Sequence, residues 1–188
     1  MDTTSNPVSE AKFVLAFGIE QQSVKDFAIN LVEWSSRNKG VPLRIHINSQ
    51  GGNILDAIFL REELKRIKAA GHKLTIAAYG RAASCATWLL QVADRRVIGE
   101  DSWLLIHEVR SSMDGPLSAL RREVKRVEQL QDQTFGMICK RSKLTRERIL
   151  SEVEGGNDWW INAALALELD LVDEIDCDTQ PSTETSAS

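Results

Sequence analysis

Cysteine is scarce in this sequence, and the cysteines that occur lie far apart. Cys85, Cys139 and Cys177 are an odd number in a chain of 188 residues, and no two stand at the short spacing of a metal-binding pair. The pattern excludes a disulfide framework and a zinc site of the usual kind, and it is typical of a reducing compartment. We therefore expect a cytoplasmic protein that works without a metal or another cofactor.

Long hydrophobic runs and an excess of positive charge are missing too. No apolar stretch approaches the length of about 20 residues that a membrane-spanning helix needs. The opening residues, MDTTSNPVSE, lack the basic start and apolar centre of a signal peptide. The formal net charge is -4, which removes a general electrostatic argument for binding nucleic acid or an anionic membrane. We expect neither partner.

Segments of strand type and helix type alternate along the chain. We expect strands at residues 12–17, 42–48, 73–79, 95–99, 102–108 and 158–161, and helices at 22–38, 54–70, 84–93, 114–143, 145–153 and 163–169. The alternation predicts one α/β domain with a largely parallel sheet over residues 12–176. The Ser/Thr-rich tails at 1–11 and 177–188 are expected to be disordered. The apolar face of the first helix is predicted to consist of Val24, Phe27, Ala28, Leu31 and Val32.

Two segments place chemically useful groups at the carboxyl ends of strands, where ligands bind in such sheets. INSQGGN ends a strand with Gly51 and Gly52, which either form a tight turn or bring free backbone N–H groups to an oxyanion. It lacks the GxGxxG pattern or the lysine of a phosphate-binding loop. Ser84, in GRAASCATWLL, either caps the following helix or is a nucleophile at a strand-to-helix turn.

Of the three histidines, one is placed like a catalytic base. His107 ends the apolar run WLLI and precedes a polar loop. His46 lies within a strand and faces away from its apolar side, and His72 is expected in a solvated turn. Asp158 is either a turn aspartate or a carboxylate that orients an imidazole, shielded in part by the two tryptophans that follow it.

Four motifs in this order resemble the proteolytic subunit of the Clp protease, a serine peptidase of crotonase-like fold. The family patterns INSPGG and GxAAS are met by INSQGG and GRAAS. A histidine after a short apolar strand is met by LLIHE, and an aspartate before an aromatic residue and a helix ending in GLVD by DWWINAALALELDLVD. The resemblance runs from about Phe13 to Ile175. The order Ser–His–Asp excludes the α/β-hydrolases, whose order is Ser–Asp–His.

The resemblance implies a role for each matched residue. Ser84 corresponds to the nucleophile, His107 to the general base and acid, and Asp158 to the residue that orients the base. The backbone amides of Gly52 and Cys85 correspond to the oxyanion hole, and Gly51 with Gly52 to a substrate-binding loop. The implied fold is α/β, a superhelix of repeated ββα units with a protruding handle helix at about 115–141.

Family likeness also implies peptide or unfolded-protein substrates and a homo-oligomeric ring, a heptamer or a double heptamer. The handle carries apolar side chains at helical spacing beyond what its own domain needs: Leu117, Leu120, Val124, Val127, Leu130 and Phe135. Whether a Clp-type ATPase unfoldase supplies the substrate stays open.

Four departures from the family pattern bear on these expectations. Gln50 replaces a proline and loosens the glycine loop, and Cys85 replaces a common methionine and is expected to be a small core residue. EVRSSMDG after His107 replaces a Pro- and Gly-containing segment that pairs with substrate. Asn157 replaces an arginine of an inter-ring ion pair, so one ring and two rings both stay open.

Three alternatives remain at this point. The first is a viral head-maturation protease of the same family. The second is a crotonase-type acyl-CoA enzyme, which shares the fold and typically uses acidic residues. The third is an inactive ring scaffold, although inactive members normally lose a triad residue and all three are present here.

Overall fold

A mostly parallel, seven-stranded sheet forms the centre of the protein. The computed structural model describes residues 10–177. The main path of the sheet has the order β1 (Ala11–Leu15), β2 (Leu43–Ser49), β3 (Leu74–Ala83), β4 (Arg95–Gly99) and β7 (Glu174–Asp176), all parallel. Outside that path, β5 (Trp103–Ile106) pairs in parallel with the end of β3, and β6 (Trp159–Asn162) pairs antiparallel with β5. The prediction of a largely parallel α/β sheet is confirmed.

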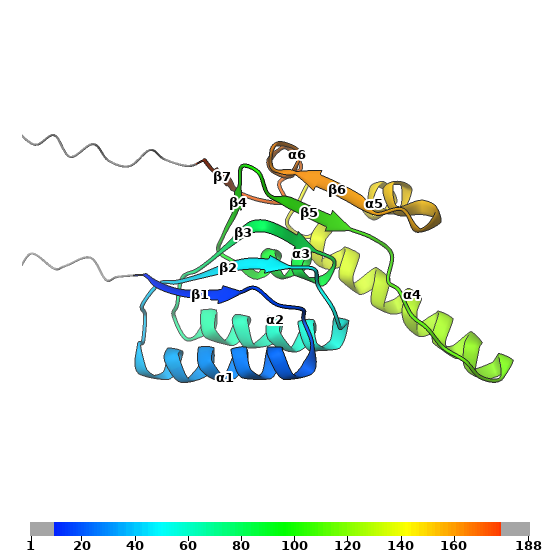
Figure 1. Cartoon of the computed structure of the whole chain (residues 1–188), viewed down its shortest axis with the longest axis horizontal. Coiled ribbons are helices and arrows are strands. Elements are labelled where there is room, and N and C mark those ends of the chain that lie inside the picture. Colours follow the sequence, from blue (N-terminus) through cyan, green and yellow to red (C-terminus); the bar gives the residue numbers. More distant parts are fainter. Residues whose placement is uncertain (1–9, 178–188) are drawn as a thin grey trace, which may run out of the picture.

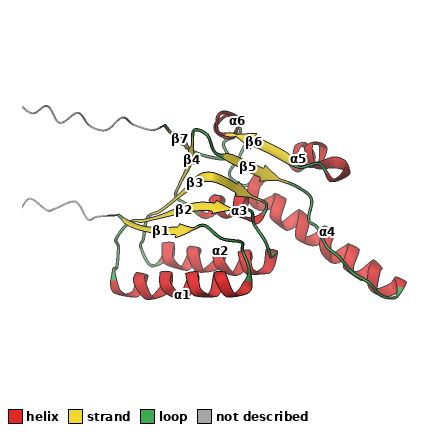
Figure 2. Cartoon of the chain, in the orientation of Figure 1, coloured by secondary structure: helices red, strands yellow, loops and turns green. Residues whose placement is uncertain are grey.

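Helices cover one side of this sheet and extend beyond it. In Figure 1, α1 (Gln21–Arg37) and α2 (Ile54–Ala69) lie side by side below the strands. The other helices are α3 (Cys85–Leu89), α4 (Leu117–Cys139), α5 (Arg146–Val153) and α6 (Ala163–Glu168). Figure 2 shows α4 reaching away from the body, as expected of a handle helix. No helix within residues 10–177 is both long and apolar enough to cross a membrane.

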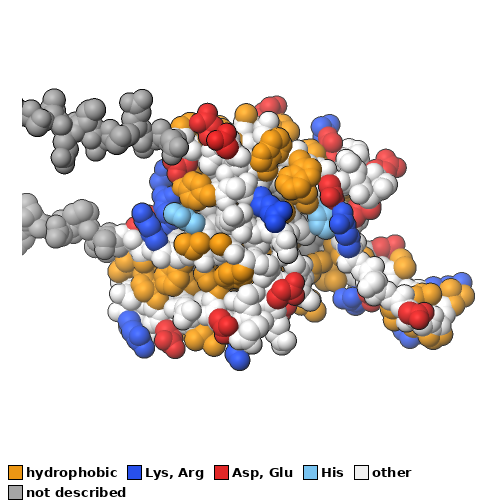
Figure 3. All heavy atoms as spheres, viewed as in Figure 1, with side chains coloured by type: hydrophobic (Ala, Val, Ile, Leu, Met, Phe, Trp, Pro, Cys, Tyr) orange, Lys and Arg blue, Asp and Glu red, His pale blue; other side chains and the backbone are white. Residues whose placement is uncertain are grey.

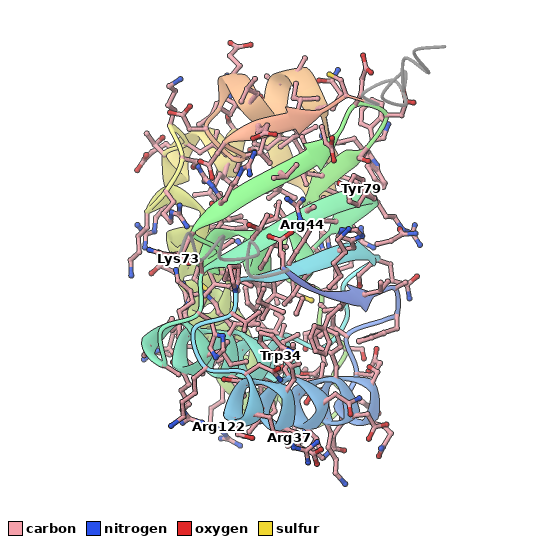
Figure 4. The ribbon with its side chains drawn as sticks, turned by 90° about the vertical axis from the view of Figure 1, so that its left-hand side faces the viewer. Trp34, Arg37, Arg44, Lys73, Tyr79 and Arg122 are labelled. Carbon is pink, nitrogen blue, oxygen red and sulfur yellow. The ribbon has the colours of Figure 1, made fainter. Side chains whose placement is uncertain are left out.

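The core lies between the sheet and its helices because the strands alternate apolar and polar side chains. Leu43, Ile45 and Ile47 of β2 are fully buried with the apolar faces of α1 and α2. Arg44 and His46 point to the opposite side of the sheet, as the alternation predicts. Figure 4 shows Arg44 at the sheet, with Trp34 nearer to the helices. On the same open side, the His46 ring meets Tyr79 edge to face.

A buried arginine links the segment that precedes β7 to the sheet. Arg96 of β4 is 4% exposed, and its guanidinium bonds to the Asp173 carboxylate and to the Gln91 side chain. It also donates to the main-chain carbonyls of Arg141 and Asp170. Burial would raise the pKa of Asp173, but the hydrogen bonds and charge of Arg96 outweigh it and hold that pKa below its usual value. The network therefore fastens three segments that are distant in sequence.

Two side-chain predictions for this region are wrong. Val32 is 45% exposed, and Ser35, one turn beyond Leu31, takes the buried place on α1. His72 is 2% exposed rather than solvated. Its Nε2 lies 2.9 Å from the Ser35 hydroxyl and its Nδ1 lies 2.8 Å from the Val41 carbonyl. With both ring nitrogens satisfied, burial of the imidazole carries no unpaired polar group.

Some predicted boundaries shift as well. Strand β1 begins at Ala11, inside the expected tail, and most of both tails (1–9 and 178–188) lies outside the described residues. The helix expected at 84–93 is α3 followed by a 3₁₀ turn at Leu90–Val92. Pro116 immediately precedes α4. Asn162 caps α6 and accepts a hydrogen bond from the Leu165 amide at 2.9 Å.

Candidate active site

Ser84 stands at a strained turn between β3 and α3. Its φ is +57°, a region that serine rarely occupies and that costs about 1–3 kcal/mol. Although Ser84 precedes the first helical residue, its side chain makes no capping hydrogen bond in the described part of the chain. Capping therefore does not explain the serine.

Two contacts with β5 hold this turn in place. The Ser84 amide donates to the Leu105 carbonyl at 2.9 Å. The fully buried Thr87 hydroxyl lies 2.8 Å from the same carbonyl and 2.7 Å from that of Ala82. Because Leu105 precedes His107 by two residues, these bonds also fix the distance between the turn and the end of β5.

The Gly51–Gly52 loop packs directly against the serine. Gly51 has a φ of +88°, and a Cβ there would lie 2.6 Å from the Ala83 carbonyl oxygen and 2.7 Å from the Ser84 Cβ. The main chain on either side is pinned to Ile19, whose amide donates to Gly51 and whose carbonyl accepts from Asn53. The sequence motif therefore exists because only glycine permits this approach.

The amides of Gly52 and Cys85 lie together at this junction, beside the same cavity. Within residues 10–177, neither donates to a main-chain oxygen. Burial raises the pKa of the Cys85 thiol to about 12, against an opposing hydrogen bond from the Gly52 backbone. The thiol is therefore a neutral core group beside the two amides, as its predicted role as a small core residue requires.

His107 and Asp158 follow from the pairing of β5 with β6. Ile106 is paired with Trp159, so continuing the antiparallel register by one position sets His107 opposite Asp158. Directly opposed residues share a face of the sheet. The side chains nevertheless have other partners. The Asp158 Oδ1 accepts from Arg110 Nη2 at 2.7 Å, and the His107 Nδ1 lies against the Glu108 carbonyl.

Ser84 and His107 open into one cavity of about 340 Å³. Gly52, Cys85 and the start of α2 line it together with apolar side chains of α3 and α4. Residues 108–111, which follow β5, form its charged edge. Asp158 is outside this lining, and its side chain is 41% exposed. Of the two tryptophans expected to shield it in part, Trp159 is buried and Trp160 is exposed, and much of the carboxylate stays open to solvent.

One residue beside the site did not stand out in the sequence. Arg110 lines the cavity and pairs with Asp158. An arginine in a polar loop of a charged chain carries no signal by itself, and only the departure of residues 108–115 from the family pattern distinguishes this segment. Among residues 10–177, no three His, Cys, Asp or Glu side chains gather as a metal ion would need.

The arrangement suits acyl transfer. A hydroxyl on a rigid turn lines a cavity with an imidazole at its wall and, at its base, two amides that donate to no main-chain oxygen among the described residues. Such amides can stabilise the oxyanion of a tetrahedral intermediate. The apolar walls provided by α3 and α4 can receive a substrate side chain.

Comparison with known proteins points the same way. The family model described as Clp protease matches residues 1–178. A Chlorella vulgaris protein, "ATP-dependent Clp protease proteolytic subunit", is 30% identical over 149 residues, 78% of this chain and 71% of that protein. A Porphyromonas gingivalis protein of the same name is 24% identical over 93% of this chain and 78% of its own length. The Pseudomonas aeruginosa "ATP-dependent Clp protease proteolytic subunit 2" is 25% identical over 87% of this chain and 80% of its own.

Proposed function

Because the chain belongs to the Clp protease family, we propose that it is a serine endopeptidase in which Ser84, His107 and Asp158 form the catalytic triad. The observation that carries this assignment is the strained, non-capping Ser84 that shares a cavity with His107. The substrate is a peptide or an unfolded protein chain. No cofactor takes part in the chemistry.

The reaction begins with attack of the Ser84 Oγ on the carbonyl carbon of a peptide bond. The His107 Nε2 accepts the hydroxyl proton, and the tetrahedral oxyanion is held by the Gly52 and Cys85 amides. The same imidazole then gives the proton to the leaving amine, which departs and leaves an acyl-Ser84 ester. Water, deprotonated by His107, hydrolyses this ester and restores the serine.

Asp158 supports the imidazole. A carboxylate at Nδ1 fixes the tautomer that leaves Nε2 free and stabilises the imidazolium formed during attack. The β5–β6 pairing supports this role, because its last pair, Ile106 with Trp159, is followed in the same register by His107 and Asp158. Closure of the triad requires the His107 ring to leave the Glu108 carbonyl and Asp158 to turn from Arg110.

Assembly into a ring is part of the proposal. Helix α4 protrudes from the body in Figure 1, and Figure 3 shows apolar side chains at its far end. Leu117 is 62% exposed and Val124 is 57% exposed, whereas Phe135 is buried in the body. An apolar helix end that its own domain leaves uncovered supports packing against another subunit. We propose a heptamer or double heptamer, a cytoplasmic location supported by three free cysteines, and substrate delivery by a Clp-type ATPase.

The alternatives differ from this proposal in what Ser84 does. A crotonase-type acyl-CoA enzyme or an inactive scaffold has no use for a nucleophilic serine, and the family match gives the acyl-CoA alternative no support. A head-maturation protease would use the same triad on one structural protein as its substrate. It would therefore cleave that protein and leave general peptides uncut.

Cleavage of fluorogenic peptides by the Ser84→Ala variant tests the function. The variant should fold normally and retain at most the roughly 10³-fold acceleration that binding and the oxyanion hole supply alone. Ser151→Ala is the matched control, because Ser151 is an exposed serine whose hydroxyl donates a hydrogen bond to the Arg148 carbonyl, outside the cavity lining. Wild-type rates in Ser84→Ala would exclude this nucleophile.

A further inference from the structure

The two side chains that must bond to each other during catalysis each hold another partner. The His107 Nδ1 lies against the carbonyl of the next residue, Glu108. This contact keeps the tautomer with a free Nε2, but a neutral carbonyl cannot compensate an imidazolium charge as a carboxylate does. The Asp158 carboxylate meanwhile accepts a hydrogen bond from Arg110 at 2.7 Å.

The main chain around Arg110 is anchored on both sides. The Val109 amide donates to the Gln131 side chain of α4 at 2.9 Å. The Ser111 hydroxyl donates to Glu123, also on α4, at 2.7 Å. Because these bonds flank Arg110, they hold the base of its side chain in place while its guanidinium reaches Asp158. The loop is therefore held at both neighbours of Arg110, although the guanidinium itself lies at the surface.

We propose that the Arg110–Asp158 ion pair is an autoinhibitory contact that withholds the carboxylate from His107. This inference rests on the proposed function, since it concerns the same triad. While Arg110 is paired with Asp158, Ser84 retains His107 as its base, but His107 lacks the carboxylate that stabilises its imidazolium form. Opening of the ion pair frees Asp158 to accept the Nδ1–H of His107, the residue that would lie opposite it if the β5–β6 register continued by one position.

The exposure of the two side chains determines how strongly the ion pair should slow Ser84 acylation. Arg110 is 69% exposed and Asp158 is 41% exposed. Exposed ion pairs are weak, so removing this one should raise the rate of Ser84 acylation by roughly two- to fivefold. Salt screens exposed charges. The wild-type rate should therefore approach that of a variant without the arginine as ionic strength rises.

The test compares Arg110→Gln with wild type in full-length protein. The rate of Ser84 acylation by a fluorophosphonate and the rate of peptide cleavage are measured at low and high salt. We expect Arg110→Gln to be faster at about 10 mM ionic strength, where screening is weak, and nearly equal to wild type at about 1 M. Arg148→Gln is the matched control, because it removes another ion pair of an exposed arginine, with Glu152, that lies outside the cavity lining. Its rate should equal that of wild type at both salt concentrations.

The same substitution made in an Asp158→Asn variant distinguishes loss of the ion pair from a direct effect of the Arg110 charge on His107. In Asp158→Asn, Arg110 has no carboxylate to withhold, so adding Arg110→Gln should leave the acylation rate unchanged. A similar gain in acylation rate with and without the Asp158 carboxylate would overturn the proposal. It would show that the positive charge of Arg110 slows the reaction directly, without withholding Asp158. A slower Arg110→Gln would also overturn it, since Arg110 would then orient Asp158 productively. If wild type and every variant leave Ser84 unmodified, the proposed function itself fails.

Discussion

Adding a methyl group at Gly51 should disable the nucleophile much more than it destabilises the fold. Gly51 has a φ of +88°, and its new Cβ would meet the Ala83 carbonyl oxygen at 2.6 Å and the Ser84 Cβ at 2.7 Å. Both are parts of the catalytic turn, and no flexible side-chain end is available to move aside. The turn must shift, and a displacement of about 1 Å at a reacting group can lower a rate about 100-fold.

Gly40→Ala supplies the matched control. Gly40 also has a positive φ, +73°, but no described atom lies within 4 Å of the Cβ that would be added. Both variants carry the left-handed strain of about 1–2 kcal/mol. For a chain of this size, that strain should lower Tm by roughly 2–8 °C. The two variants therefore share the backbone strain, and the clash occurs only at buried Gly51.

The assay pairs thermal unfolding with the rate of Ser84 acylation by a fluorophosphonate. Gly40→Ala should lose stability and keep its acylation rate. Gly51→Ala should lose at least as much stability and about 100-fold in rate. Equal acylation rates in the two variants would refute the reasoning, because they would show that the contact between Gly51 and Ser84 does not position the hydroxyl.

Three other predictions follow from the packing and the ionisable groups. Arg96→Met should lower the free energy of unfolding by roughly 3 kcal/mol, because it leaves Asp173 and two carbonyls without their donor; denaturant titration of the variant against wild type measures this. The pKa of Asp173 is lowered in the folded state, so its stabilisation is present above its unfolded value of about 3.9 and is lost as the pH falls through the folded value. The stability difference between wild type and Asp173→Asn should shrink from pH 6 to about pH 2, and a constant difference would contradict this cause. Burial raises the pKa of Cys85 to about 12, so at pH 8 its thiol is almost entirely un-ionised. Iodoacetamide should therefore modify exposed Cys177 first, as peptide mapping would show, and rapid modification of Cys85 in native protein would contradict this cause.

Local patterns in the sequence predict the sheet and its helices well, because alternation and helical spacing reflect burial directly. Leu43, Ile45 and Ile47 are buried as their spacing indicates. Val32 was misplaced because an apolar side chain at the edge of a helix face is indistinguishable in sequence from one at its centre. Ser35 is buried instead because its hydroxyl satisfies His72, a contact between residues 37 positions apart that no local pattern contains.

The candidate site likewise contains residues that the sequence predicts and one residue that it does not. Gly51, Gly52, Ser84 and His107 are found from motifs because each requires a particular residue type at the end of a strand. The structure brings them to one place. Arg110 is different, because its effect depends on which carboxylate its long side chain reaches. Only the three-dimensional arrangement shows that the partner is Asp158.

The central claim is that Ser84 is the nucleophile of a serine peptidase, and identification of the covalent adduct tests it most directly. The full-length protein is treated with a fluorophosphonate, digested and analysed by mass spectrometry, with His107→Ala treated in parallel. We predict one adduct, on the Ser84 hydroxyl, whose formation slows sharply in His107→Ala. An adduct on another serine, or peptide cleavage that persists while Ser84 remains unmodified, would contradict the account.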